Sequence, residues 1–183
     1  MKMIPSALVF LIILGVGVYV FMSEPWQRPA PPSSTYANSV YGISFSYPDG
    51  YVLDEREAGN GERSRYVITL ISGEALANIP QDGEGPPAIT IDIFQNNLDK
   101  QKVEEWIRGN SFSNFKLSPD DALASTTVAG RDAYAYTWDG LYRGESTVFA
   151  HKDNIIMASV TYLSPEDAIR PDFFQILASL ALY

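Results

Sequence analysis

Few residues in this chain have the chemistry to catalyse a reaction. The single histidine, His151, could act as a general base only beside a serine nucleophile and an orienting acid. No Gly-x-Ser-x-Gly turn supplies such a serine, and Gly83-Glu84-Gly85 lacks the lysine that follows a phosphate-binding glycine loop. We therefore predict that His151 is an edge or surface residue at the end of a strand.

Carboxylates offer another route to catalysis, or to calcium binding. A glycosidase needs two acids that flank its substrate, and an EF-hand needs oxygen ligands at fixed spacing. The acids that stand close together in this chain are predicted to be solvated in turns or loops, and none has EF-hand spacing. We therefore expect no catalytic residue, no metal and no cofactor, and a hydrolase is the least favoured hypothesis. These acids are Asp54, Glu55, Glu57, Asp82, Glu84, Asp120 and Asp121.

Aromatic residues form a more suggestive cluster. Tyr134, Tyr136 and Trp138 alternate along one predicted strand and share a face, and Tyr142 lies just past the hairpin turn that follows. Because tyrosine and tryptophan dominate binding hot spots, this face could be a platform for a partner or a ligand. Alternatively, a helix covers the face and the rings belong to the core. The two interpretations differ in exposure, since a platform needs at least two of these rings open to solvent.

Composition limits the classes of function. The chain has 183 residues, with 22 acidic and 13 basic side chains, a formal net charge of −9 and no cysteine. Phosphate backbones should repel so acidic a protein, so no nucleic-acid partner is expected. Without cysteine the chain cannot be a disulfide scaffold, use a thiol nucleophile or bind zinc through thiolates.

An uncharged apolar stretch, Met3–Met22, lies near the amino end. A helix of this length would reach roughly 30 Å, the thickness of a bilayer core. No small-x-small cleavage pattern follows it directly, so residues 1–22 are expected to be an uncleaved single-pass anchor. Lys2 favours a cytoplasmic amino end, with the remaining chain outside the cell membrane. Three aromatic residues are typical of a belt at the membrane interface: Tyr19, Phe21 and Trp26.

The residues after the anchor divide into a linker and one domain. Residues 23–39 are rich in proline and serine, which is typical of an extended linker. Residues 40–183 have the length of a single domain. The stretch Tyr41–Tyr47 alternates apolar residues with serine and ends at a Pro-Asp-Gly turn, so it is predicted to be a strand with one buried face.

The same signals predict the other elements. Gly73–Pro87 is rich in glycine, proline and acids and should be a long surface loop. One helix is expected from an Asp99 N-cap to about Arg108, and another from a Ser164 N-cap, broken or restarted at Pro171. Strands are predicted at Tyr51–Leu53, Ser64–Ser72, Ala88–Gln95, Ser125–Val128, Arg131–Trp138, Leu141–Lys152 and Ile155–Tyr162, with turns at Ala129-Gly130, Asp139-Gly140 and Asp153-Asn154. Short hairpins with interrupting helices predict an α+β domain, an antiparallel sheet covered by helices.

Three short motifs resemble a known family. Residues 41–51, Tyr-Gly-Ile-Ser-Phe-Ser-Tyr-Pro-Asp-Gly-Tyr, resemble the start of PsbP-like domains, where a Gly-aromatic strand ends in Tyr-Pro-x-Gly-Trp and Tyr51 stands in place of the tryptophan. Val128–Ala133 is similar to the family's Val-x-Gly-x-x-Ala hairpin, and Ile176–Leu180 to its closing helix. The resemblance covers residues 40–183 and implies an α-β-α sandwich. It also implies an accessory or adaptor role, because relatives include extrinsic photosystem II subunits, bacterial envelope lipoproteins and a Ran-binding protein.

The favoured function is therefore a non-catalytic binding or assembly module. Its anchor would hold it outside the cytoplasm, in the periplasm or at the cell surface, where an envelope protein is the expected partner. The alternative is a small-ligand or carbohydrate-binding domain that uses the aromatic strand face.

Overall fold

The computed structural model describes residues 32–59, 64–79 and 84–183. Pro32–Tyr183 form one compact unit. The expected anchor and aromatic belt fall within residues 1–31 and lie outside the described ranges. Within those ranges, no helix combines the length and the apolar character needed to cross a membrane.

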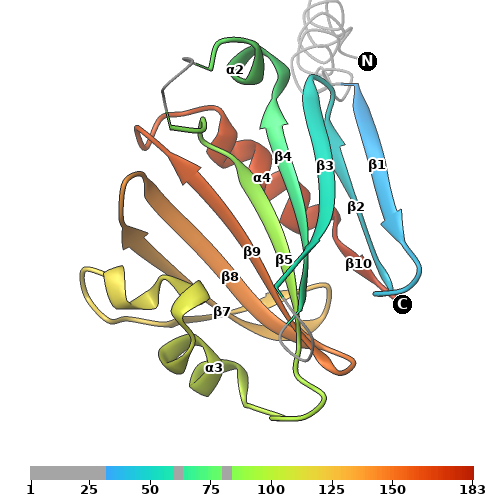
Figure 1. Ribbon diagram of the computed structural model, residues 1–183, viewed down its shortest axis with the longest axis vertical. Helices are drawn as coiled ribbons and strands as arrows, with labels where there is room; N and C mark the ends of the chain where they lie inside the picture. Colours follow the sequence, from blue (N-terminus) through green and yellow to red (C-terminus); the bar gives the residue numbers. More distant parts are fainter. Residues whose placement is uncertain (1–31, 60–63, 80–83) are drawn as a thin grey trace, which may run out of the picture. The chain divides into compact units, whose positions relative to one another are not determined.

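A seven-stranded antiparallel sheet forms the centre of the unit, in the order β3-β4-β5-β9-β8-β7-β6 (Figure 1). This arrangement confirms the prediction of an α+β domain built on an antiparallel sheet. The strands are β3 (Tyr51–Ala58), β4 (Arg65–Ser72), β5 (Ile89–Gln95), β6 (Ala124–Val128), β7 (Arg131–Asp139), β8 (Arg143–His151) and β9 (Asn154–Tyr162).

A smaller antiparallel sheet has the order β1-β2-β10 and comprises β1 (Ser33–Asn38), β2 (Ile43–Pro48) and β10 (Ala181–Leu182). As predicted, β2 buries one face through Ile43 and Phe45. The predicted linker, 23–39, extends too far, because its last residues form β1 and pair with β2 along the whole strand. The prolines of the linker all precede β1, so every residue of β1 has a backbone N–H that can donate a hydrogen bond.

Helices interrupt the strands: α2 (Gly73–Ala77), α3 (Val103–Gly109) and α4 (Ile169–Ser179), with the single 3₁₀ turns η2 (Ser111–Ser113) and η3 (Phe115–Leu117). The predicted loop Gly73–Pro87 therefore begins with a short helix, capped by the hydroxyl of Ser72, which accepts from the backbone N–H of Ala75. The helix expected from Asp99 starts later, at Val103. Asn96 explains the delay, because its side-chain amide exchanges two hydrogen bonds with the backbone of Gln101 and closes a loop.

The last helix also starts later than predicted. The carboxylate of Asp167 accepts from the backbone N–H groups of Leu163 and Ser164, so this segment is a tight loop rather than the first turn of a helix. Pro171 lies in the first turn of α4, where a missing N–H costs little, and does not break it.

Three hairpin turns test the predicted registers. The Ala129-Gly130 turn is confirmed, with φ values of 48° and 73° that suit a two-residue hairpin. Asp139 pairs with Arg143, so residues 140–142 form a three-residue loop instead of a turn at Asp139-Gly140. His151 pairs with Asn154, which moves the last turn one residue earlier, to Lys152-Asp153.

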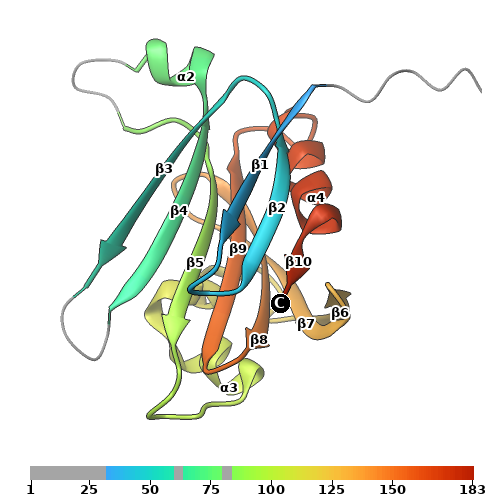
Figure 2. The same cartoon turned by 90° about the vertical axis from the view of Figure 1, so that its right-hand side faces the viewer.

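Both faces of the large sheet are packed (Figure 2). On one side, which we call the α4 face, Ile89, Ile91 and Ile93 of β5 contact α4 and the small sheet. On the other, the α3 face, Phe94 of β5 packs with Trp106 of α3 and with η3. Because side chains alternate along a strand, each residue of β5 belongs to one face or the other.

Candidate functional site

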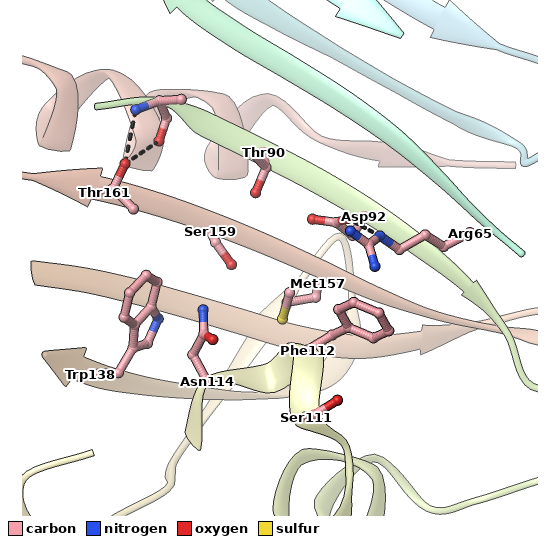
Figure 3. A pocket seen from close by; sticks show the side chains of 11 residues that line it. Arg65, Thr90, Asp92, Ser111, Phe112, Asn114, Trp138, Met157, Ser159 and Thr161 are labelled. Atoms are coloured by element: carbon pink, nitrogen blue, oxygen red, sulfur yellow. Dashed lines mark hydrogen bonds and ion pairs between the residues drawn. The ribbon is translucent and has the colours of Figure 1, made fainter. Parts of the chain in front are cut away.

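The α3 face is only partly covered. Helix α3 and the two 3₁₀ turns pack over one end of it, and a cavity of about 270 Å³ opens beside them on β4, β5 and β9. We call it the polar cavity, since six of its eleven lining residues carry a hydroxyl, carboxylate or guanidinium group (Figure 3). The groups used below are Arg65, Thr90, Asp92, Phe112, Trp138 and Ser159.

An ion pair forms one wall of the polar cavity. Nε of Arg65 on β4 lies 3.0 Å from Oδ1 of Asp92 on β5, and these side chains are only 23% and 10% exposed. The guanidinium carbon of Arg65 also lies 4.0 Å from the centre of the Phe112 ring, so the cation stacks on an aromatic face. Burial raises the pKa of Asp92, and the opposing attraction of Arg65 does not cancel this effect.

A chain of hydrogen bonds forms the opposite wall. The indole N–H of Trp138 donates to the hydroxyl of Ser146 at 3.0 Å, and Oγ of Ser146 lies 2.8 Å from Oγ of Ser159. Trp138 can reach across β8 because Gly144, its cross-strand partner, has no side chain. A Cβ on Gly144 would lie 2.2 Å from the indole ring. The network therefore fixes the position of Ser159 in the cavity wall.

The predicted aromatic platform is not exposed. Tyr136 and Trp138 retain only 5% and 8% of their accessible surface, and Tyr134 and Tyr142 are half-buried. Helix α3 covers this face together with the turns η2 and η3, as the alternative interpretation expected. The Tyr136 hydroxyl donates to the carbonyl of Ser113 at 2.6 Å. Of the four predicted residues, only Trp138 lines the polar cavity.

His151 is neither a surface nor an edge residue. It is buried at the end of β8, an interior strand of the sheet, and its ring lies beside Gly42. Burial, followed by the nearby charges of Lys152 and Arg131, lowers the pKa of His151. A neutral imidazole in this position is part of the packing between the two sheets.

The clustered acids do not converge on the polar cavity. Asp54, Glu55 and Glu57 are exposed as predicted, but they lie on the strand β3 and not in a turn or loop. Glu84 and the pair Asp120 and Asp121 are exposed in irregular segments, and Asp82 lies outside the described ranges. Over residues 32–59, 64–79 and 84–183, no three His, Cys, Asp or Glu side chains are close enough to hold a metal ion.

The sequence interpretation missed both members of the ion pair. Asp92 carried a usable signal, because it is the one charged residue in the predicted strand Ala88–Gln95 and alternates with isoleucines. A charge in the middle of a central strand is unusual unless it has a partner. Arg65, at the start of β4, offered no comparable signal.

Comparison with known proteins agrees with this fold. No protein-family model matches the sequence, and neither does any curated protein. The solution structure of cyanobacterial PsbP (CyanoP) from Synechocystis sp. PCC 6803 is similar, with a TM-score of 0.53 and 13% sequence identity over 88% of this chain and 98% of that chain. The fold is PsbP-like. A crystal structure from Bacteroides thetaiotaomicron has a TM-score of 0.44 and 14% identity, over 81% of this chain and 48% of that chain.

Proposed function

We propose that this protein is a membrane-anchored, bacterial PsbP-like protein whose domain is a non-catalytic binding module for a small polar ligand. The apolar stretch Met3–Met22 would carry the module on the outer side of the cell membrane. The polar cavity would be its ligand site. The observation that carries this proposal is the Arg65–Asp92 pair in the cavity wall.

A buried ion pair needs an explanation beyond stability. Removing two charges from water costs about as much as their attraction returns, so apolar replacements of such pairs are often neutral or stabilising. A desolvated pair beside a cavity is instead typical of a site that recognises a ligand. Since Asp92 accepts hydrogen bonds and Arg65 donates them, the pair suits a molecule that can do both.

The remaining wall favours a neutral ligand that is rich in hydroxyl groups. Thr90 and Ser159 can each donate or accept, and Phe112 and Trp138 add apolar ring surface. Aromatic and polar groups together suit a sugar, which has both apolar C–H faces and hydroxyl edges. The volume of about 270 Å³ is small for a ligand pocket and favours one sugar ring over an oligosaccharide.

Binding of a panel of hexoses and polyols to the full chain in detergent micelles would test the proposal, by calorimetry or ligand-observed NMR. Asp92→Asn should weaken binding at least about tenfold, because a charged hydrogen bond contributes about 1.5–3 kcal/mol. Asp54→Asn is the matched control, since Asp54 is exposed on the edge strand β3. Unchanged affinity in Asp92→Asn, or no binding by any member of the panel, would overturn the assignment.

Two further measurements test the rest of the proposal. NMR of the ligand after long incubation should show it chemically unchanged, and any turnover would contradict a non-catalytic role. Protease added to intact cells should digest the domain if it lies outside the membrane. Protection of the domain until the cells are lysed would show that the proposed orientation is wrong.

A further inference from the structure

The two edges of the large sheet are built differently. The edge strand β3 contains Asp54, Glu55, Arg56 and Glu57, whereas β6 at the other edge has the sequence Ala-Ser-Thr-Thr-Val and no charge. Charged side chains are a common device that prevents an edge strand from pairing with another chain. All residues of β6 except Val128 are exposed, so the strand is both accessible and unprotected.

The register shows which backbone groups of β6 are open. Val128 pairs with Arg131 across the two-residue turn, and paired residues along an antiparallel ladder alternate between hydrogen-bonded and non-bonded positions. Ser125 and Thr127 occupy the non-bonded positions, so their N–H and C=O groups point away from β7. Outside the strand ladders, no backbone–backbone hydrogen bond in the described part of the chain uses these groups.

A groove beside β6 could receive a side chain. A cavity of about 300 Å³ lies on the α4 face, between the small residues Ala124 and Ala135 of the sheet and the rings of Phe173 and Phe174 on α4. The Phe174 side chain is 50% exposed. A strand that paired with β6 would point alternate side chains to the α4 face, where one of them would enter this cavity.

Charge selects the kind of strand that fits. Between Lys116 and Arg131 the chain has two acids, Asp120 and Asp121, and no base, and Asp120 lines the groove. A second copy of β6 would bring these acids toward an identical pair, in a protein of net charge −9. Like charges at such a contact oppose association, and opposite charges favour it.

We propose that β6 accepts an extended segment of another protein, in which apolar residues alternate with lysine or arginine, as an additional strand of the sheet. The inference rests on the proposed role as a binding module but not on the polar cavity, which lies on the other face. Backbone hydrogen bonds to Ser125 and Thr127 would supply affinity. The groove beside Phe174 would supply selectivity for an apolar side chain.

A synthetic peptide that alternates valine with lysine is the probe, and its counterpart with glutamate in place of lysine is the charge control. Fluorescence anisotropy with the full chain in detergent micelles should show saturable binding of the basic peptide and at least about tenfold weaker binding of the acidic one. Amide hydrogen exchange at Ser125 and Thr127 should slow on binding. No binding up to about 1 mM peptide, or unchanged exchange at β6, would overturn the proposal.

Matched variants keep the test independent of folding. Ser125→Pro removes an outward N–H and should weaken peptide binding at least about tenfold, whereas Ser125→Ala keeps that N–H and should bind normally. Phe174→Ser should weaken binding without a proline in the sheet, and equal binding by both Ser125→Pro and Phe174→Ser would refute the assignment. Asp92→Asn should leave peptide binding unchanged even where hexose binding is lost. Dimerisation through β6 without peptide would assign this edge to a second copy and overturn the proposal.

Discussion

Removal of Arg65 and removal of Asp92 should affect stability very differently. The two charged atoms lie 3.0 Å apart, so their attraction is about 5 kcal/mol at an effective dielectric constant of about 20. The pKa of Asp92 is nevertheless raised, with burial as the largest cause, so desolvation of the carboxylate outweighs this attraction. The net contribution of the pair is therefore small, but a carboxylate left alone in the same place is expensive.

The size of each change in the free energy of unfolding depends on which side chain of the pair is left behind. Arg65→Met leaves the Asp92 carboxyl in the cavity wall without its cationic partner. Breaking a buried pair from one side costs about 3–5 kcal/mol, and we expect about 2–3 kcal/mol here because Asp92 borders an open cavity. Asp92→Asn leaves a guanidinium that is 23% exposed and stacked on Phe112, so we expect a change below about 1 kcal/mol in either direction.

The two variants should also differ in how their free energy of unfolding depends on pH. The pKa of Asp92 in the folded protein lies above its ordinary value of 3.8, so the folded state holds a proton that the unfolded state has released. The contribution of Asp92 to the free energy of unfolding is therefore greatest below pH 3.8 and falls as the pH rises through the folded pKa. Arg65→Met removes an attraction that lowers this pKa, so its destabilisation should grow between about pH 4 and 7. Asp92→Asn should flatten this part of the profile.

Urea denaturation of the full chain in detergent micelles, at about pH 4.5 and 7, would measure all four corners of the double-mutant cycle. We expect Arg65→Met to lower the free energy of unfolding much less when Asp92→Asn is also present than it does alone. If Asp92→Asn alone is as damaging as Arg65→Met at pH 7, the pair is a stabilising element. The argument that a ligand explains its presence would then fail.

Three other perturbations follow from single contacts. Gly144→Ala should lower the free energy of unfolding by about 1–3 kcal/mol, because the new carbon would lie 2.2 Å from the Trp138 ring; urea denaturation measures this. Tyr136→Phe removes a 2.6 Å bond to the Ser113 carbonyl and should cost about 1–2 kcal/mol, with faster amide exchange in η2 and η3. The pKa of His151 is lowered from 6.5, so its contribution to stability is complete above pH 6.5 and is lost as the pH falls through the folded pKa. His151→Gln should therefore flatten this decline in a plot of the free energy of unfolding against pH.

Local patterns predicted strands such as β2 and β5 well because these strands bury at least one face. The alternation in β2 and in β5, and the Ala129-Gly130 turn, are properties of neighbouring residues, so they can be recognised without the rest of the fold. β1 has no such pattern. Its residues are mainly polar, and it becomes a strand because β2 offers a backbone partner along its whole length.

Competition between nearby hydrogen bonds explains the helix starts that were misplaced. Asp99 and Ser164 are good capping residues, but each lies close to another polar side chain that binds the same stretch of backbone. Asn96 closes the loop before α3, and Asp167 closes the one before α4. Which of two capping residues hydrogen-bonds the backbone depends on the path that the chain takes between its strands. That path cannot be predicted from the neighbouring residues.

The candidate site was harder to predict, because it lies where α3, η2 and η3 leave part of the α3 face uncovered. Arg65 and Asp92 meet only because β4 and β5 pair, and the cavity beside them exists only because η2 and η3 end where they do. The residues of these turns carry a weak helical signal. The strand position of Trp138 left open whether its ring is exposed or covered. The ring forms part of the cavity wall because Gly144 lets the indole lie across β8.

The alternation of β8 makes the two proposed binding surfaces separable. Ser146 points to the α3 face and joins the hydrogen-bond network of the polar cavity, while Glu145 and Thr147 on either side of it point to the α4 face, along the groove beside β6. The polar cavity and the groove share no lining residue, so effects of variants at the two surfaces should add. Coupling between hexose and peptide binding would instead require the backbone of β8 to shift. A difference of more than about threefold in peptide affinity with and without hexose would show that shift.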